Sequence, residues 1–456
     1  MEDNKGYLDN TSNTKSEQTN KSHGMTWFIV IVVVLLVAIG ITYFYVFKEA
    51  APINTEDVNQ SQTNNIINNS PVNIISAENV VGANNQFAMD LYSKYKSKEG
   101  NVFYSPYSIS SALTMTYEGA KGRTAQEIQA VLHLPNSIDE VRSGYQNVNN
   151  ELNKADKQYN LSVANALWTQ EDYPFINTYL ENVEEFYDGK ATNLNFKTDT
   201  ENSRITINNW VENKTNNRIK DLIAKEVLLP DTKLVLTNAV YFKANWSKQF
   251  NVDKTHNGTF TLGSGQNITS EFMSQEDNFS YGETGNLKIL EMNYLGNDLS
   301  MIVILPKENK LSDIENEIKV DNLKNWKNSM SDEKVIVILP KFKFETKYDM
   351  SDDLKQMGMP TAFKYPDADF TGISPPTANS PNGELYISAV IHQTFIEVAE
   401  YGTEAAAATA VIMSTGSSGP IEQPKYFIAD HPFIFIIQQK STGNILFIGR
   451  MSNPQA

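Results

Sequence analysis

An uncharged apolar run near the N-terminus divides this chain into unequal parts. The run extends from Thr26 to Phe47 and reads TWFIVIVVVLLVAIGITYFYVF. As a helix rising ~1.5 Å per residue it is ~33 Å long, which matches a bilayer core of ~30 Å. Aromatic side chains stand at both ends, Trp27 at one and Tyr43 to Tyr45 at the other, as is typical of membrane interfaces. The run therefore predicts one transmembrane helix over residues 26–47.

A cleaved signal peptide and a buried core helix are the competing interpretations of this run. The run is too long for a signal peptide, and no small-x-small cleavage site follows it, so an uncleaved signal-anchor is favoured. Lys5, Lys15 and Lys21 precede the run and only Lys48 follows it closely. Basic residues favour the inner side, so we expect a single-pass protein of the cell membrane whose N-terminus is inside.

The anchor separates a short tail from a long extracytoplasmic, extracellular part. Residues 1–25 are expected to form an N-terminal cytoplasmic tail. Residues 48–77 are rich in Asn, Gln, Ser and Thr, with too few apolar residues in any regular period to bury a face, and are interpreted as a flexible linker. Residues 78–456 show neither an internal repeat nor a second linker, so we expect them to fold as one domain.

Charge and cysteine content exclude several classes of function. Asp and Glu outnumber Lys and Arg by 54 to 38, and the resulting net charge of −16 repels nucleic acid and anionic lipid headgroups. The sequence has no cysteine, and therefore no disulfide framework, thiolate metal site or cysteine nucleophile. Nucleic acid is not expected as a partner.

The sequence also lacks the common motifs of catalysis. It contains no GxSxG, HExxH or GxGxxG motif and no phosphate-binding glycine loop. Its five histidines are scattered singly, without the spacing of a metal site. A hydrolase triad, whose residues can be distant in the sequence and meet only in the folded protein, stays an open alternative. The sequence favours a protein that is not an enzyme and that holds neither a metal nor a cofactor.

Hydrophobic patterning of the large domain predicts helices first and long strands later, an α+β order. Ser105 as N-cap with Pro106 inside begins one helix, and Thr124 with Glu127 has the form of a capping box at another. Further helices are expected near residues 174–188, 202–214 and 349–358. Strands are expected at 161–169, 234–243, 299–305, 335–344 and 384–400, and a hairpin at 433–439 and 445–451.

The segment from Glu400 to Pro420, EYGTEAAAATAVIMSTGSSGP, has contradictory local propensities. Thr403 to Ala408 suit the start of a helix, whereas Thr409 to Ile412 suit a strand. An ordinary helix followed by a loop is one interpretation. As a strand, the segment has one face without charge, and a segment that suits loop, helix and strand is able to serve as a moving part.

This segment resembles the hinge of inhibitory members of the serpin family. The resemblance recurs in family order at NVFYSPYSISSALTMTYEGAKGRTAQEI (101–128), LTNAVYFKANW (236–246), YFIADHPFIFII (426–437) and ILFIGRMSNP (445–454). It implies an inhibitory, membrane-anchored, prokaryotic-like member with the serpin fold, in which three β-sheets and about nine helices carry an exposed reactive-centre loop. The matching hinge residues are Glu400, Gly402, Thr403, Glu404, Ala405, Ala406, Ala407, Ala408 and Thr409.

The function implied by this resemblance is suicide inhibition of serine proteases. A target protease cleaves the loop, and the loop over residues 400–420 then inserts into the main sheet as a strand, which traps the acyl-enzyme by a conformational change. A non-inhibitory serpin-fold binding or chaperone-like protein is the alternative. The chain is expected to act as a monomer.

The resemblance places the reactive bond between Gly416 and Ser417, within a window from Met413 to Ser418. This window contains neither Lys nor Arg, so the expected targets are elastase-, subtilisin- or chymotrypsin-like serine proteases, and a cysteine protease stays open.

Two further groups are carried over from the family. Trp246 matches a tryptophan at the top of the main sheet, where Lys341 pairs with Glu400. A polar cluster beneath the centre of the sheet, where its strands part, is matched by Ser105, Ser108, Asn238 and His392.

Overall fold

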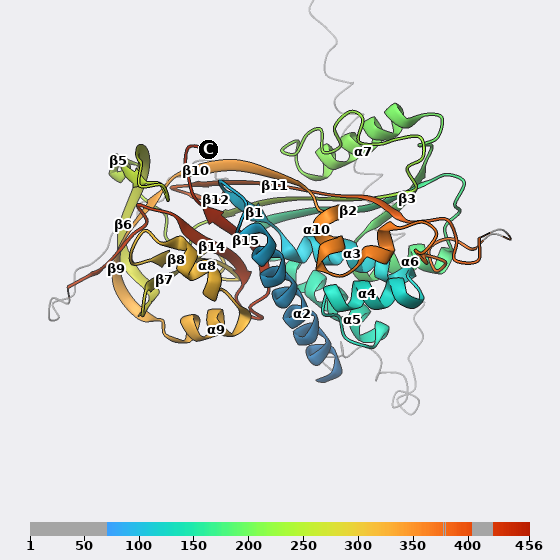
Figure 1. The fold of residues 1–456 in the computed structure, drawn as a ribbon. Helices are drawn as coiled ribbons and strands as arrows, with labels where there is room; N and C mark the ends of the chain where they lie inside the picture. The colour runs from blue at the N-terminus through green and yellow to red at the C-terminus, as the bar shows by residue number, and fades with distance from the viewer. Residues whose placement is uncertain (1–70, 377, 379, 404–422) are drawn as a thin grey trace, which may run out of the picture. The chain divides into compact units, whose positions relative to one another are not determined.

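The computed structural model describes residues 71–376, 378, 380–403 and 423–456 (Figure 1). The predicted transmembrane helix over 26–47 lies outside these residues, and so do Glu404 to Thr409 and the predicted reactive bond at Gly416 and Ser417. None of the helices in the described ranges has the length and apolarity needed to cross a bilayer.

Nine α-helices lie within the described residues, in agreement with the expected number. The first begins at Pro71, inside the stretch 48–77 that the sequence assigns to the linker, because Ser76 already packs against the domain and is 2% exposed. The helices are α2 (Pro71–Tyr95), α3 (Pro106–Gly119), α4 (Gly122–Val131), α5 (Ile138–Leu152), α6 (Asn177–Tyr187), α7 (Thr200–Lys214), α8 (Leu311–Glu317), α9 (Val320–Asn328) and α10 (Ser351–Met357).

The strands form two hydrogen-bonded sheets in the described part of the chain. A nine-stranded sheet has the order β1-β15-β14-β8-β7-β6-β9-β13, with β5 paired to β6, and a six-stranded sheet, here called the main sheet, has the order β10-β11-β12-β4-β2-β3. The strands are β1 (Val102–Tyr104), β2 (Tyr159–Gln170), β3 (Lys190–Leu194), β4 (Leu234–Asn245), β5 (His256–Thr261), β6 (Asn267–Thr284), β7 (Leu287–Asn293), β8 (Leu299–Pro306), β9 (Ser331–Pro340), β10 (Phe342–Asp349), β11 (Ile387–Ala399), β12 (Gly402–Thr403), β13 (Lys425–Ile428), β14 (Phe433–Gln439) and β15 (Ile445–Met451).

The count of two sheets differs from the expected three because β6 is long enough to serve two groups of strands. Its first residues pair with β5, from Thr261↔Asn267 to His256↔Phe272, and its last residues pair with β7, from Ser280↔Glu291 to Thr284↔Leu287. Continuous hydrogen bonding along β6 therefore joins strands that a shorter β6 would leave in separate sheets.

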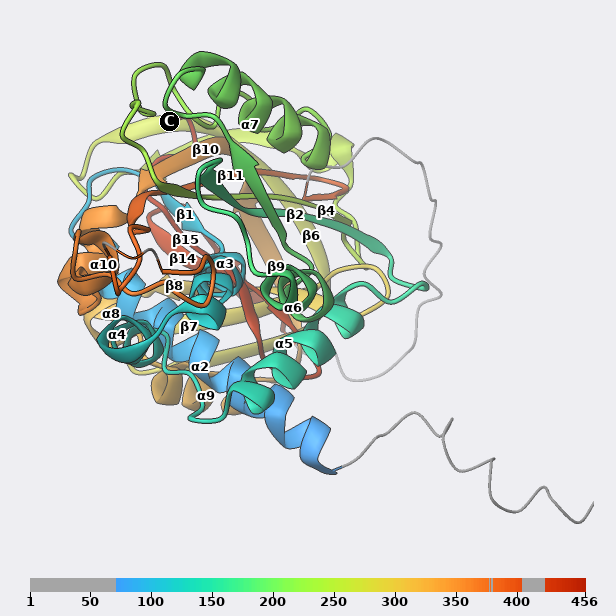
Figure 2. The same ribbon diagram turned by 90° about the vertical axis from the view of Figure 1, so that its right-hand side faces the viewer.

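The main sheet separates two hydrophobic cores. Alternate side chains of a strand point to opposite faces, and β4 shows this clearly. Leu236 and Val240 belong to the larger core, which includes residues of α3, whereas Val235 and Ala239 belong to a smaller core with residues of α7. Figure 2 shows α7 on one side of β2 and β11 and α3 on the other.

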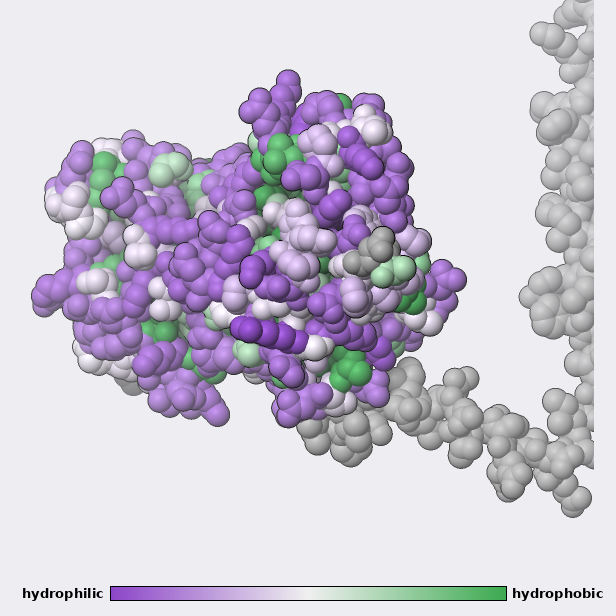
Figure 3. All heavy atoms as spheres, turned by 45° about the vertical axis from the view of Figure 1, so that its right-hand side comes forward, coloured by the Kyte–Doolittle hydropathy of each residue, from purple (hydrophilic) through white to green (hydrophobic). Residues whose placement is uncertain are grey.

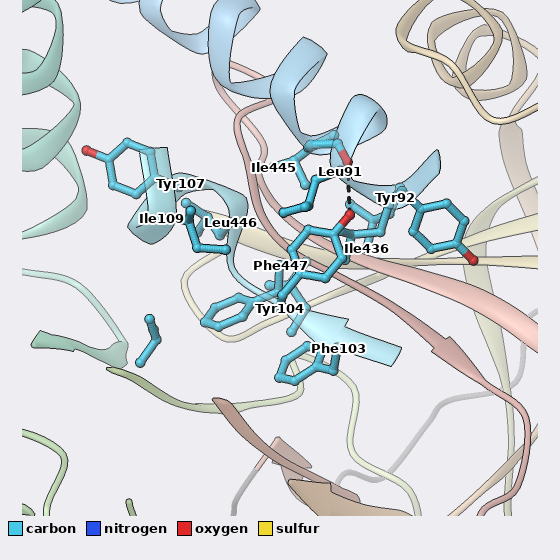
Figure 4. Close-up of a cluster of buried hydrophobic side chains, with 14 of the residues drawn as sticks. Leu91, Tyr92, Phe103, Tyr104, Tyr107, Ile109, Ile436, Ile445, Leu446 and Phe447 are labelled. Atoms are coloured by element: carbon cyan, nitrogen blue, oxygen red, sulfur yellow. Dashed lines mark hydrogen bonds between the residues drawn. The ribbon is translucent and has the colours of Figure 1, made fainter. Parts of the chain in front are cut away.

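Aromatic packing connects the two sheets. Phe103 of β1 stacks on Phe435 and Phe447 of the nine-stranded sheet, with centroid distances of 5.6 and 5.3 Å. It also meets Phe344 of the main sheet edge-on at 6.1 Å. Figure 4 shows Phe103 and Tyr104 among the aliphatic side chains of this core. The sheets are thus held at a fixed distance by close-packed rings.

Most predicted elements are confirmed, including the Ser105 N-cap, whose hydroxyl oxygen accepts a hydrogen bond from the Ser108 amide at 3.2 Å. The single strand predicted at 335–344 is wrong. It is divided into β9 and β10, because Pro340 has no N–H to extend the ladder and the chain then crosses to the main sheet.

The capping box predicted at Thr124 and Glu127 is also wrong. The helix begins at Gly122, and the Glu127 carboxylate accepts hydrogen bonds from the amide and hydroxyl of Thr361, both at 2.8 Å. The Thr124 hydroxyl accepts from the Asp369 amide at 3.0 Å. Both side chains therefore serve tertiary contacts rather than the start of their own helix.

Candidate functional site

A two-residue strand, β12, lies between the two central strands of the main sheet. Gly402 and Thr403 pair with Ala399 and Val398 of β11 on one side and with Asn245 and Ala244 of β4 on the other. Along the rest of their length β11 and β4 pair directly and in parallel, from Ile387↔Leu234 to Phe395↔Tyr241. The sheet is therefore parted at one end and closed elsewhere.

Gly402 is the residue that allows β12 to enter the sheet. A Cβ atom at this position would lie 2.1 Å from the carbonyl oxygen of Ala244, and the glycine has a φ of +153°. No side chain fits so close to the backbone of β4. The predicted hinge glycine is thus required by the geometry of the gap.

Thr403 ends the described part of the hinge in a buried position. It is 1% exposed, and its hydroxyl oxygen lies 2.7 Å from that of Tyr294. Tyr294 stacks on Trp246 with ring centroids 4.5 Å apart and an interplanar angle of 11°. Burial raises the pKa of Tyr294 above its usual value, so the phenol stays protonated and able to donate.

Trp246 fixes the chain on both sides of the turn that leads into β12. Its indole nitrogen donates to the Ala399 carbonyl at 3.0 Å, and its backbone amide donates to the Tyr401 carbonyl at 2.8 Å. The residue is 2% exposed and follows directly on β4. The structure thus places Trp246 at the parted end of the main sheet.

Glu400 and Lys341 form the predicted ion pair, with 3.2 Å between the carboxylate and the ammonium nitrogen. Glu400 is only 5% exposed, and the Thr255 hydroxyl also donates to its carboxylate at 2.7 Å. Burial by itself raises the pKa of Glu400, but the hydrogen bonds from Thr255, the backbone and Lys341 outweigh it, so the pKa lies below its usual value. The carboxylate is therefore charged and held by several partners.

The four predicted residues of the polar cluster come together where the start of α3 meets the main sheet. The Ser105 amide donates to Nε2 of His392 at 3.2 Å, which leaves Nδ1 to donate to the Asn238 side-chain oxygen. The Asn238 side-chain nitrogen donates to the Ser108 hydroxyl at 2.5 Å. Burial lowers the pKa of His392 to about 3, although its contact with Asn238 acts in the opposite direction, so the imidazole is neutral.

Asn165 of β2 belongs to this cluster and was missed in the sequence. Its side-chain oxygen accepts from the Ser108 hydroxyl at 3.0 Å and from Asn238, and its nitrogen donates to the Ser108 carbonyl at 3.2 Å. Asn165 lies opposite Asn238 in the sheet, and Asn238 lies opposite His392. The available signal was an asparagine inside the apolar strand LSVANALWT, where a buried amide needs partners.

The cluster therefore crosses the line along which the main sheet opens. Asn238 belongs to β4 and His392 to β11, the two strands that β12 parts at their far end. If β4 and β11 separate along their whole length, the bond between Asn238 and His392 must break. No group of three or more His, Asp or Glu residues placed to hold a metal ion occurs in the described ranges.

An α+β domain whose two parallel central strands are parted at one end by a third, two-residue strand defines an architectural class of protein. Comparison with known sequences identifies the class. The model of the family "Serpin (serine protease inhibitor)" matches residues 82–454, so the chain belongs to the serpin family.

Relatives cover nearly the whole of the large domain. A serpin-like protein of Methanosarcina mazei is 42% identical over 394 residues, which is 84% of this chain and 90% of that protein. One from Thermococcus kodakarensis is 46% identical over 378 residues, 82% of this chain and 86% of its own length. The human leukocyte elastase inhibitor is 37% identical over 388 residues, 83% of this chain and 100% of its own length.

Solved structures agree on the fold. Serpin48 of the insect Tenebrio molitor is 30% identical with a TM-score of 0.72, over 82% of this chain and 98% of its own. Uncleaved ovalbumin is 31% identical with a TM-score of 0.72, over 82% and 100%. Human thyroxine-binding globulin complexed with its ligand is 27% identical with a TM-score of 0.75, over 83% and 99%.

Proposed function

We propose that this chain is a suicide inhibitor of serine proteases and not an enzyme. The observation that carries the proposal is β12, because the first residues of the loop already stand in the gap between β4 and β11. If β12 continues between these strands, β4 and β11 no longer pair with each other. Each of them pairs instead with the new strand, in antiparallel orientation. Each added backbone hydrogen bond contributes about 1 kcal/mol net.

The proposed reaction starts when the protease serine attacks the carbonyl of Gly416. The bond to Ser417 breaks, the amine of Ser417 leaves with a proton, and an ester joins the loop to the protease. The loop then inserts before water hydrolyses the ester. As a strand, residues 403–416 span ~45 Å at ~3.3 Å per residue, so insertion moves the protease by a distance comparable to its own size.

The residues that follow Thr403 suit rapid insertion. Glu404 is the only charged residue from Thr403 to Thr409, and Ala405 to Ala408 add almost no bulk. A buried charge or large side chain on the inward face would delay closure of the sheet. Inhibition, rather than the alternative of a non-inhibitory binding or chaperone-like protein, is therefore the function that this hinge supports.

The polar cluster is proposed to keep the sheet closed until the loop is cut. Ser105, Ser108, Asn238 and His392, with Asn165, bond β2, β4 and β11 to the start of α3. These hydrogen bonds are buried, and each contributes about 1 kcal/mol net. They therefore oppose separation of β4 and β11 before the loop is cut, without preventing it afterwards. Trp246, Lys341 and Glu400 hold the hinge at the parted end.

The expected targets are elastase-, subtilisin- or chymotrypsin-like serine proteases, with a cysteine protease as a further option. The window 413–418 has no basic residue for a trypsin-like primary pocket. The similarity to a leukocyte elastase inhibitor favours the elastase-like class. Thyroxine-binding globulin, by its name, binds a small molecule, so the fold alone does not decide function.

We further propose that the inhibitor acts at the outer surface of the cell membrane as a monomer. The tail 1–25, the transmembrane helix 26–47 and the linker 48–77 would then hold the domain 78–456 on the extracytoplasmic side. The apolar run and the distribution of lysines around it support this arrangement. Membrane fractionation with alkaline extraction tests it, because loss of the chain to the soluble fraction would contradict an anchor.

The inhibitory function is tested with the full-length chain and purified subtilisin, elastase and chymotrypsin. A covalent complex that survives denaturing electrophoresis is expected with at least one of them. The mass of the released C-terminal peptide then identifies the cleaved bond, expected between Gly416 and Ser417. Cleavage of the chain by all three proteases, each left fully active, would contradict inhibition and support the non-inhibitory alternative.

A further inference from the structure

Large exposed hydrophobic side chains are few in the described part of the chain, and two of them lie on the same face of one short strand. On the face of the molecule drawn in Figure 3, hydrophobic residues form small patches among hydrophilic ones. Tyr426 and Ile428 of β13 are 53% and 37% exposed, whereas Phe427 between them is fully buried. Strand alternation thus turns both side chains outward.

The neighbouring strand extends this apolar surface. In the parallel pair of β13 and β9, Tyr426 lies beside Ile336 and Ile428 beside Ile338, and paired residues share a face. Both isoleucines are half-buried. The four side chains, Ile336, Ile338, Tyr426 and Ile428, are here called the outer patch.

The outer patch carries no unbalanced charge at its border with β6. Ile336 lies opposite Glu276 and Ile338 opposite Ser274. The Glu276 carboxylate is paired with the Lys334 ammonium at 2.7 Å. In a chain of net charge −16, this apolar surface differs from most of the exterior, and the cation beside it is the Lys288 ammonium, which donates to the Tyr426 carbonyl at 2.8 Å. Such a surface fits a partner whose contacting side chains are themselves mainly apolar.

The position of the outer patch indicates which partner would meet it. β13 is the first described strand after the predicted reactive bond, and it is an edge strand of the nine-stranded sheet. The chain from Gly416 to Lys425 spans at most ~30 Å when fully extended. A protease domain of ~230 residues is ~45 Å across, judged from its radius of gyration. A protease bound at that bond is therefore tethered within its own diameter of the patch.

We propose that the outer patch is a secondary binding site for the target protease, used before the loop is cut. The inference rests on the proposed inhibitory function and deepens it by naming a surface outside the loop. Contacts at the patch would slow dissociation of the non-covalent complex, so more encounters proceed to acylation. A single well-packed aromatic contact of this kind contributes about tenfold in affinity.

The test compares the wild-type chain, the double variant Tyr426→Ala/Ile428→Ala and a control, Leu229→Ala, in full-length form. Leu229 is 52% exposed and precedes β4 at the end away from β12, about 40 Å from the hinge at ~3.3 Å per residue. The probe is whichever of subtilisin, elastase or chymotrypsin forms covalent complex fastest with the wild type. The readouts are the second-order rate of complex formation and the number of inhibitor molecules consumed per protease.

We expect the double variant to form complex about tenfold more slowly, with unchanged consumption per protease and an unchanged control. An unchanged rate, or an equal fall in the control, would overturn the proposal while leaving inhibition intact. If the wild type traps no protease, the inhibitory function itself fails. Should the double variant not fold, Tyr426→Ala alone is used, because Tyr426 is 53% exposed.

Self-association is the competing use of such a surface. Light scattering of the wild type over a range of concentrations measures it directly. A dimer that dissociates in the Tyr426→Ala/Ile428→Ala variant would assign the outer patch to a second copy of this chain and overturn a role in protease binding. If the wild type is monomeric at all concentrations, the protease remains the proposed occupant of the outer patch.

Discussion

The hydroxyl groups of Tyr294 and Thr403 lie 2.7 Å apart at the parted end of the main sheet. Tyr294 is fixed in turn by stacking on Trp246, so a rigid aromatic pair holds the last described residue of the hinge. The described end of the hinge is therefore already paired within the main sheet. The Tyr294 hydroxyl adds to the backbone pairing of Gly402 and Thr403 with β4 and β11 and to the close backbone approach at Gly402.

Removing the Tyr294 hydroxyl should weaken this engagement. In Tyr294→Phe the ring still stacks on Trp246, but Thr403 loses its partner in a buried site. We expect the free energy of unfolding to fall by about 1 kcal/mol and the melting temperature by about 2 °C. Calorimetry measures both. Tyr365→Phe, at a tyrosine that is 57% exposed, is the control and should change neither.

Arginine at position 403 should abolish the proposed trapping and leave the chain as an ordinary substrate of the protease. Thr403 is 1% exposed between β4 and β11, and a guanidinium buried there without a partner costs several kcal/mol. Thr403→Arg should still be cleaved, while the yield of covalent complex falls more than tenfold on a denaturing gel. Thr403→Ser keeps the hydroxyl and should retain trapping. Equal trapping by both variants would show that insertion does not pass through this position.

Reversing the charge of Glu400 should loosen the hinge and promote polymers. In Glu400→Lys two ammonium groups face each other where a 3.2 Å ion pair stood. We expect higher oligomers on a native gel after mild heating. The exchange Glu400→Lys with Lys341→Glu restores opposite charges and should reduce polymerisation again. If the single variant stays monomeric, the ion pair does not guard the opening of the sheet.

His392 should make the fold sensitive to acid. Its pKa is about 3 in the folded chain against 6.5 for the free group, so between these values the unfolded chain binds a proton that the folded chain does not. The free energy of unfolding therefore falls as pH falls through this window, by up to about 1.4 kcal/mol per pH unit. Below a pH of about 3 the folded chain is protonated as well, so His392 causes no further loss of stability.

Urea unfolding at pH 7 and pH 5 measures this contribution. His392→Gln cannot titrate and should lose less stability between the two pH values than the wild type. His256→Gln, at an exposed histidine of β5, should behave as the wild type does. If the free energy of unfolding had the same pH dependence in all three chains, His392 would not be the cause of the acid sensitivity.

The sequence was informative wherever local chemistry determined the structure. Ser105 followed by Pro106 is a helix start by itself, and the hairpin strands 433–439 and 445–451 were predicted with the bounds that the structure has. Glu127 was misassigned because its partner, Thr361, is distant in sequence. Local patterns give no indication of such a contact.

The candidate site was predictable only in part, for the same reason. His392 and Asn238 were found through the family resemblance, whereas Asn165, which resides one strand further, was not. The insertion of β12 depends on the space between β4 and β11, which no propensity of Gly402 or Thr403 reveals. The outer patch arises from the pairing of β9 with β13, two strands far apart in the chain.

The crossing at Lys341 has a mechanical consequence. Its backbone leaves β9 of one sheet and enters β10 of the other, while its ammonium group holds the carboxylate of Glu400. A change in the angle between the two sheets would therefore also displace the ionic partner of Glu400. Lys341 therefore connects the junction of the two sheets to Glu400, at the start of the hinge.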